Sequence, residues 1–318
     1  MSTPTDQPAD NVAYPYQTEP LPESTNLPLP GSDPASAAAV NPDNPPWGLL
    51  AAVGVVLGSL ALVVLLQVAG IVPYFVWRAA NKLPLMVGGQ PDKNVILISI
   101  LSMLPAHLLT LVLAWLIVTG RGKRAFWKAL GWAWSPRYGF IGDIAACVLI
   151  TLGLYAIGVA LFYVFGNQET ELVRMLNSSQ AARYAIVVMA VLTAPLVEEV
   201  VYRGVLYSAL QRRTGRLWGV LGVTLVFALI HVPQYLPNYG AISAILVLSL
   251  TLTFVRAYTG RLLPCMIIHT IFNSLSSVGI LLEPYLKTVP SPTEQTTASL
   301  LPLLLSTSPV VQLISHLF

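Results

Sequence analysis

Residues 194–204 read Ala-Pro-Leu-Val-Glu-Glu-Val-Val-Tyr-Arg-Gly and lie inside an otherwise apolar run from Tyr184 to Leu210. An apolar run of about 20 residues predicts a membrane-spanning helix. Each ionisable side chain at the centre of a bilayer costs roughly 2.5–3.5 kcal/mol on insertion scales. The run nevertheless carries Glu198, Glu199 and Arg203. We therefore expect the helix bundle to use these three groups.

The helical spacing of these three residues gives the two glutamates different directions and therefore different possible roles. Glu199 and Arg203 are four residues apart and share a helix face, so they can form an ion pair. Glu198 is rotated by about 100° from Glu199 and can face partners on other helices. Pro195 precedes Glu198 by three residues, removes one backbone hydrogen bond and predicts a bend. Such a break is tolerated in a membrane where protein or a water-filled cavity meets the freed carbonyl.

The composition is that of a polytopic membrane protein. Of the 318 residues, 55% are hydrophobic and only 10% are charged, and the mean hydropathy is +0.69. Soluble domains carry about 25% charged residues. Cys147 and Cys265, the two cysteines, lie in apolar stretches, which argues against a disulfide framework.

Apolar segments of helix length predict an all-α polytopic membrane helix bundle with seven to eight transmembrane helices. The predicted segments are Trp47–Trp77, Val95–Thr119, Tyr138–Phe165, Tyr184–Leu210, Leu217–Val232, Ala241–Tyr258 and Leu262–Leu282. An eighth apolar run, Leu300–Phe318, is broken by Pro309 and predicts either a last helix or an interfacial one.

The chain divides into four parts. Residues 1–46 contain six acidic residues and no Lys or Arg, and they are rich in Pro, Ser, Thr and Ala, which predicts a disordered tail. Residues 47–180 hold the N-terminal transmembrane helices, and residues 181–283 are expected to form the core that carries the candidate catalytic residues. Residues 284–318 form a loop and a short apolar helix.

The positive-inside rule predicts the orientation. Basic residues gather in the connections at 121–137, 212–216 and 256–261, which lie on one side if the segments alternate. That side is expected to be cytoplasmic, and the N-terminus lies there too, in a bacterial inner membrane. Arg78, Lys82 and Lys93 in the first outside loop oppose this orientation.

Two further apolar segments carry polar groups. The segment Leu217–Val232 holds His231, and the last predicted segment holds His269 and Asn273, which are four residues apart on one helix face. Counted inward from the cytoplasmic ends at 1.5 Å per residue, these groups and Glu198 lie roughly 10–21 Å deep. We therefore expect three helices to place them in one layer, in a pocket that contains water.

This set of residues permits two kinds of peptide hydrolysis. Glu198 beside an imidazole can take a proton from water, while His269 and Asn273 donate hydrogen bonds to the oxyanion. Alternatively, Glu198, His231 and His269 can hold zinc, with water in the fourth position. No Ser or Cys stands in a nucleophile motif, so covalent catalysis is not expected.

These motifs resemble those of the CPBP family, the CAAX-protease and bacteriocin-processing (Abi) membrane proteins. The family shows Glu-Glu-x-x-x-Arg, Phe-x-x-x-His and His-x-x-x-Asn motifs in this order. Here they begin at Glu198, Phe227 and His269. The resemblance covers about residues 183–282.

The resemblance implies a CAAX-protease-like fold and an intramembrane endopeptidase. It implies Glu198 as the water-activating base with His231, and His269 and Asn273 as oxyanion stabilisers. It assigns Glu199 and Arg203 to organising the site. The family is commonly classed with metalloproteases, but its eukaryotic prenyl-protein members resemble glutamate-dependent enzymes. We favour the base mechanism, because Asn273 is a poor zinc ligand and a good hydrogen-bond donor.

Other interpretations stand beside these. Glu199 and Arg203 can form a buried pair that braces a bent helix, and Phe227 is interpreted as packing. His107 is interpreted as structural, with contact to the substrate as the alternative. The expected partners are the lipid bilayer and a peptide or membrane-protein substrate, with no nucleic acid. An alternative function is a non-catalytic immunity or secretion scaffold of the Abi type. A proton-relaying transporter is disfavoured because the sequence has no inverted repeat.

Overall fold

The computed structural model describes residues 41–84, 86–87, 90–166 and 168–287. This part of the chain is helical apart from one small hairpin, and it contains seven helical spans long and apolar enough to cross a membrane. The all-α prediction with seven spans is confirmed. The run Leu300–Phe318, proposed as an eighth helix, lies outside the described residues, as do residues 1–40 of the predicted tail.

The elements follow the predicted apolar segments closely. The spans are α1 (Leu49–Ala80), α2 (Lys93–Thr119), α4 (Gly139–Phe165), α9 (Arg216–Tyr235), α10 (Tyr239–Thr259) and α11 (Leu263–Lys287), together with the fourth span, Gln180–Thr214. Short helices α3 (Phe126–Ala129) and α5 (Glu171–Ser178) and the strands β1 (Met86–Val87) and β2 (Gln90–Pro91) lie in the connections.

The fourth span changes its helical form along its length. It consists of α6 (Gln180–Val188), the π-helical segment η1 (Met189–Thr193), α7 (Ala194–Glu198), the π-helical segment η2 (Glu199–Leu206) and α8 (Tyr207–Thr214). π-Helical turns inside α-helices occur frequently at functional sites. Here they lie on both sides of the Pro195–Glu198 turn, where the sequence predicts a bend.

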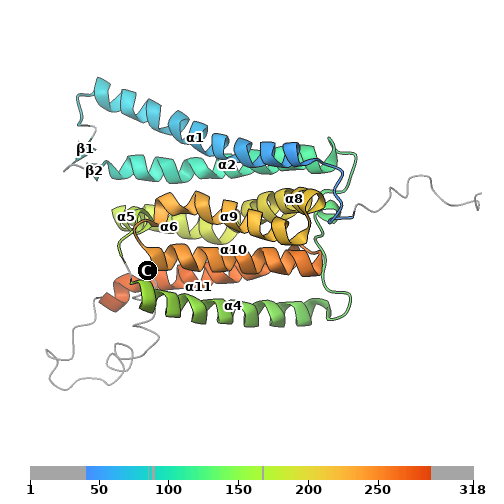
Figure 1. Ribbon diagram of the computed structural model, residues 1–318. Coiled ribbons are helices and arrows are strands. Elements are labelled where there is room, and N and C mark those ends of the chain that lie inside the picture. The colour runs from blue at the N-terminus through green and yellow to red at the C-terminus, as the bar shows by residue number, and fades with distance from the viewer. Residues whose placement is uncertain (1–40, 85, 88–89, 167, 288–318) are drawn as a thin grey trace, which may run out of the picture. The chain divides into compact units, whose positions relative to one another are not determined.

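Figure 1 shows α1 and α2 running together along one side of the bundle and α4 along the other, with α9, α10 and α11 between them. The segment η2 is buried at all eight residues and packs against α1 and α2. Small and branched side chains allow this close approach, as is usual between membrane helices. The contacts use residues such as Ala52, Val55, Ala114, Val118, Val200, Val201 and Val205.

Helix ends match local sequence signals. Asp92, Ser179 and Asn238 accept backbone N–H bonds at the starts of α2, α6 and α10. The predicted segment Leu217–Val232 ends just before Pro233, but this boundary is wrong, because α9 continues to Tyr235. Pro233 lies in the last turn, where a missing backbone N–H removes one hydrogen bond without stopping the helix.

Residues 41–46, which the sequence places in the tail, lie against the ends of α8 and α10. The Arg256 guanidinium, which is fully buried, donates to Asp43 at 2.7 Å and to the Pro42 carbonyl at 3.1 Å. The Trp47 indole N–H donates to the Val205 carbonyl at 3.1 Å. The start of α1 is thus fixed to the fourth span.

Candidate active site

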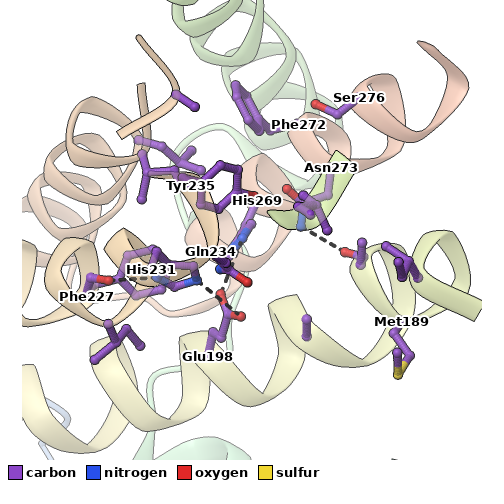
Figure 2. A pocket seen from close by; sticks show the side chains of 18 of the residues that line it. Met189, Glu198, Phe227, His231, Gln234, Tyr235, His269, Phe272, Asn273 and Ser276 are labelled. Carbon is purple, nitrogen blue, oxygen red and sulfur yellow. Dashed lines mark hydrogen bonds and ion pairs between the residues drawn. The ribbon is translucent and has the colours of Figure 1, made fainter. Parts of the chain in front are cut away.

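Glu198 lies between two imidazoles that come from different helices. Its carboxylate oxygens are 4.0 Å from Nε2 of His231 on α9 and 3.7 Å from Nε2 of His269 on α11. Figure 2 shows the three side chains facing one another. The predicted convergence of the three motifs is therefore observed, while the catalytic role of each residue stays a prediction.

The hydrogen bond of His231 determines its tautomer. Its Nδ1 lies 2.7 Å from the Phe227 carbonyl oxygen, which can only accept. The Nδ1 atom must therefore carry the proton, and in the neutral ring Nε2 presents a lone pair towards Glu198. Two acceptors 4.0 Å apart suit a water molecule that donates one hydrogen to each.

Glu199 and Arg203 form a pair with no exposed side-chain surface. Arg203 Nη1 donates to Glu199 Oε1 at 3.0 Å, and His269 Nδ1 lies 2.8 Å from the same oxygen. Since Glu199 is held as a carboxylate by Arg203, His269 donates through Nδ1. In the neutral ring, Nε2 of His269 would present a lone pair towards Glu198, as that of a neutral His231 would.

Arg203 is held on its other sides by α10 and α9. It donates to the Ser249 hydroxyl at 2.8 Å and to the Thr253 hydroxyl at 3.3 Å. Its Cζ lies 4.3 Å from the centroid of the Phe227 ring, close enough for a cation–π interaction. Phe227 thus supports the site as packing, as interpreted from the sequence.

Asn273 is engaged by the fourth span. Its Nδ2 donates to the Ala190 carbonyl at 2.8 Å, a bond drawn in Figure 2. In π-helical register the partner of this carbonyl would be the backbone N–H of residue 195, just as Ala194 N–H bonds to Met189 O. Pro195 has no N–H, so the side chain of Asn273 takes its place.

Residues 180–275 match the family model for type II CAAX prenyl endopeptidases of the Rce1-like kind. This segment is therefore similar to the Rce1-like endopeptidases. The Rce1-like segment begins where α6 begins and includes all three motifs, which confirms the resemblance to the CAAX-protease family. No curated protein and no solved structure gave a significant match to the chain.

The ionisable side chains of this segment include possible zinc ligands. Glu198, His231 and His269 have suitable donor atoms, and Glu199 orients one imidazole in the manner of a carboxylate behind a metal ligand. However, no group of three or more His, Cys, Asp or Glu side chains in the described residues has the arrangement of a metal site.

A cavity of about 600 Å³ adjoins the site, and it is lined by residues of α1, α2, α4 and α5 and by residues between 186 and 280. Most of its lining is apolar. Its polar groups include Glu198, His231, Asn273 and Gln234, one turn beyond His231. A cavity that joins ionisable groups to apolar walls suits a substrate with both peptide and apolar parts.

His107 on α2 also lines this cavity. Its Nδ1 lies 2.9 Å from the Thr193 hydroxyl on η1. The bond to the fourth span fits the structural interpretation of His107, and its place in the cavity lining fits the alternative of substrate contact, so its role stays a prediction. Neither the bond nor the position of Gln234 could be found from the sequence, because both lie outside the motifs and depend on packing between separate helices.

Proposed function

We propose that the protein is an intramembrane endopeptidase that hydrolyses a peptide bond with a water activated by Glu198 and His231. The observation that carries this proposal is the position of Glu198 between two Nε2 atoms at the wall of a largely apolar cavity. The match of residues 180–275 to a family of endopeptidases supports it. The reaction is proposed to occur near the cytoplasmic side, in agreement with the distribution of basic residues.

The reaction begins with a water molecule that donates to Glu198 and His231. Its oxygen attacks the carbonyl carbon of the substrate as Glu198 takes one proton, and the electron pair of the C=O bond moves to the carbonyl oxygen. The tetrahedral intermediate then expels the amine as the C–N bond breaks. Glu198 returns the proton to the leaving nitrogen, so the products are a carboxylic acid and an amine.

Glu199 and Arg203 are proposed to position the reacting groups. Their ion pair fixes Glu199, which in turn holds the ring of His269 through Nδ1. Neither group needs to gain or lose a proton during the reaction. Because both are fully buried, their charges also add to the field that acts on Glu198.

The central test replaces Glu198 by Gln in purified protein returned to lipid. Cleavage of a prenylated CAAX peptide and of its unprenylated counterpart should fall by about 10²- to 10⁴-fold, because the variant has no base. Glu171→Gln changes a half-exposed carboxylate on α5 and serves as the matched control. Unchanged cleavage in Glu198→Gln would instead favour the non-catalytic scaffold.

Metal removal separates the two forms of the mechanism. If Glu198 acts as the base without zinc, prolonged treatment with a chelator should leave the cleavage rate unchanged. The metal content of the purified protein, measured by mass spectrometry, should then be well below one equivalent. Loss of activity that added zinc restores would contradict the base mechanism and support the zinc alternative.

A further inference from the structure

The cavity beside Glu198 extends from the site towards the end of the bundle where α5 lies. At that end its lining reaches Tyr235, the last residue of α9, and then Thr170 and Asn238 in the connections. Towards the other end it stops inside each span. Its lining lies within 59–67 of α1, 99–110 of α2, 154–162 of α4, 186–202 of the fourth span, 227–235 of α9, 241–248 of α10 and 269–280 of α11.

The opposite end of the bundle carries the basic connections and is closed by packing. Leu130, Tyr207 and Leu262 are fully buried there and belong to the same apolar cluster as most of η2. The Arg256 guanidinium, also fully buried, donates to the Asp43 carboxylate at 2.7 Å. A peptide cannot pass between close-packed side chains. In the described part of the chain, this end therefore offers no route to Glu198.

The α5 end has a much thinner boundary. Figure 1 shows α5 at the end of the bundle where α1 finishes and α2 begins, away from α8. Leu172, Val173 and Leu176 of α5 line the cavity, while Glu171 and Arg174 form an exposed ion pair on the same short helix. A short helix and two connections thus border the cavity here, in place of the packed spans of the basic end.

Polar side chains line the way between the α5 end and the site. A peptide at membrane depth needs partners for its backbone N–H and C=O groups, because lipid offers none. Gln67, Ser99, Tyr235 and Ser277 contribute amide and hydroxyl groups to the lining. Glu198 lies at the inner end of this wall, since the lining of the fourth span stops one turn beyond it.

We infer that the peptide substrate reaches Glu198 from the α5 end of the bundle, opposite to the basic connections. With the orientation expected from the positive-inside rule, the α5 end faces away from the cytoplasm. The substrate is then an exported peptide, or a segment of a membrane protein on the outer face, that enters the bilayer to be cleaved. This inference rests on the proposed endopeptidase function.

The test labels single introduced cysteines with a membrane-impermeant maleimide in sealed vesicles of both orientations. Glu171→Cys and Lys123→Cys, both at exposed positions, mark the α5 face and the basic face. Ala194→Cys places a thiol in the cavity one turn before Glu198. It should react only in the vesicles in which Glu171→Cys reacts. The wild type is the control and should stay unlabelled, because both of its cysteines are buried and neither lines the cavity.

Labelling should also block the reaction. Ala194→Cys that carries the maleimide should lose cleavage relative to the same variant before labelling, because the adduct fills the space beside Glu198. The treated wild type should keep its rate. Ala244→Cys, at a partly buried position of the lining on α10, replaces Ala194→Cys if that variant does not fold.

The outcomes separate this inference from the proposed function. Labelling of a folded cavity variant from the basic face, from both faces or from neither would overturn the inference alone, as would undiminished cleavage by the labelled protein. Cleavage that survives in Glu198→Gln would overturn the proposed function, whatever the pattern of labelling.

Discussion

Arg203 shows how a membrane protein keeps a charge where no water reaches it. Its guanidinium has a carboxylate, two hydroxyl groups and an aromatic ring as neighbours, and it has no exposed surface. A buried pair of this kind is not by itself a strong source of stability. Its value lies in fixing Glu199, and through it the ring of His269.

Replacing Glu199 by Gln should therefore destabilise the protein strongly, because Arg203 would remain as an unpaired buried charge. The expected loss is about 3–5 kcal/mol in the free energy of unfolding. The double variant Glu199→Gln, Arg203→Met removes both charges and should recover part of this loss. Unfolding of the variants in mixed micelles with rising denaturant provides the measurement. A double variant that loses the full sum of the single effects would contradict the pairing.

Sequence patterns could predict the motif residues of this site but not their neighbours. Glu198, His231 and His269 are unusual because they are polar within apolar runs, so their approach to one another was predictable. Gln234 sits at the end of a span, where a polar residue carries little information. The partner of Asn273 is a backbone carbonyl, and side-chain patterns contain no signal for it.

At the scale of elements, the bond between Asn273 and Ala190 joins α11 to η1. The physical cause of this bond is Pro195, which has no backbone N–H to offer. We therefore predict a thermodynamic coupling between Asn273 and Pro195, which lie on different helices. Asn273→Ala should cost about 1–3 kcal/mol, because a buried carbonyl loses its partner. In a Pro195→Ala background the backbone N–H returns, so the same substitution should cost measurably less.

A double-mutant cycle on unfolding free energies measures this coupling, and activity need not be assayed. Thr270→Ala on the same helix provides the control, since its hydroxyl makes no hydrogen bond in the described part of the chain. It should show the same effect with and without Pro195. Additive effects of Asn273→Ala and Pro195→Ala would show that the proline is not the reason for the bond.

The ends of α1 and α2 are joined by Asp92, which lies just before α2. Its carboxylate accepts the Asn94 backbone N–H and also bonds to Tyr74 and Arg78 of α1. These contacts, led by the bond from Asn94, hold the pKa of Asp92 below its ordinary value of 3.8. The folded state thus binds this proton less readily than the unfolded state does.

Its contribution to stability is therefore complete at neutral pH and is lost as the pH falls through the lowered pKa. Asp92→Asn keeps a residue suited to the helix start but removes the charge. The variant should be less stable than the wild type at neutral pH, and the difference should shrink as the pH drops below about 3.8. Thermal melts across an acidic pH series test this, and a constant difference would contradict it.

The helix boundaries show what sequence predicts well at this scale. Apolar runs located all seven spans because a bilayer demands continuous hydrophobic length. The π-helical segments and the continuation of α9 past Pro233 were not predictable in the same way. Both depend on which neighbouring group meets a backbone carbonyl, and that is decided by packing in three dimensions.

At the scale of the whole molecule, the orientation in the membrane is open to a direct test. The positive-inside rule places the connection between α2 and α4 in the cytoplasm, with Arg121, Lys123 and Arg124. A reporter protein inserted there should be active as a cytoplasmic enzyme. One inserted between β1 and β2 should report the opposite side. The reverse pattern would move the candidate active site to the other half of the bilayer.

The docking of residues 42–47 also limits how the protein can be shortened or labelled. Arg256 is fully buried, and Asp43 carries the carboxylate that faces it. A shortened chain that starts after Asp43 would leave the Arg256 cation uncompensated at the end of α10. A chain that starts before Pro42 would keep the Asp43 carboxylate as its partner. An N-terminal affinity tag or fluorescent label should therefore be attached before residue 42, so that residues 42–47 keep their contacts. This holds even if the acidic residues before them prove dispensable.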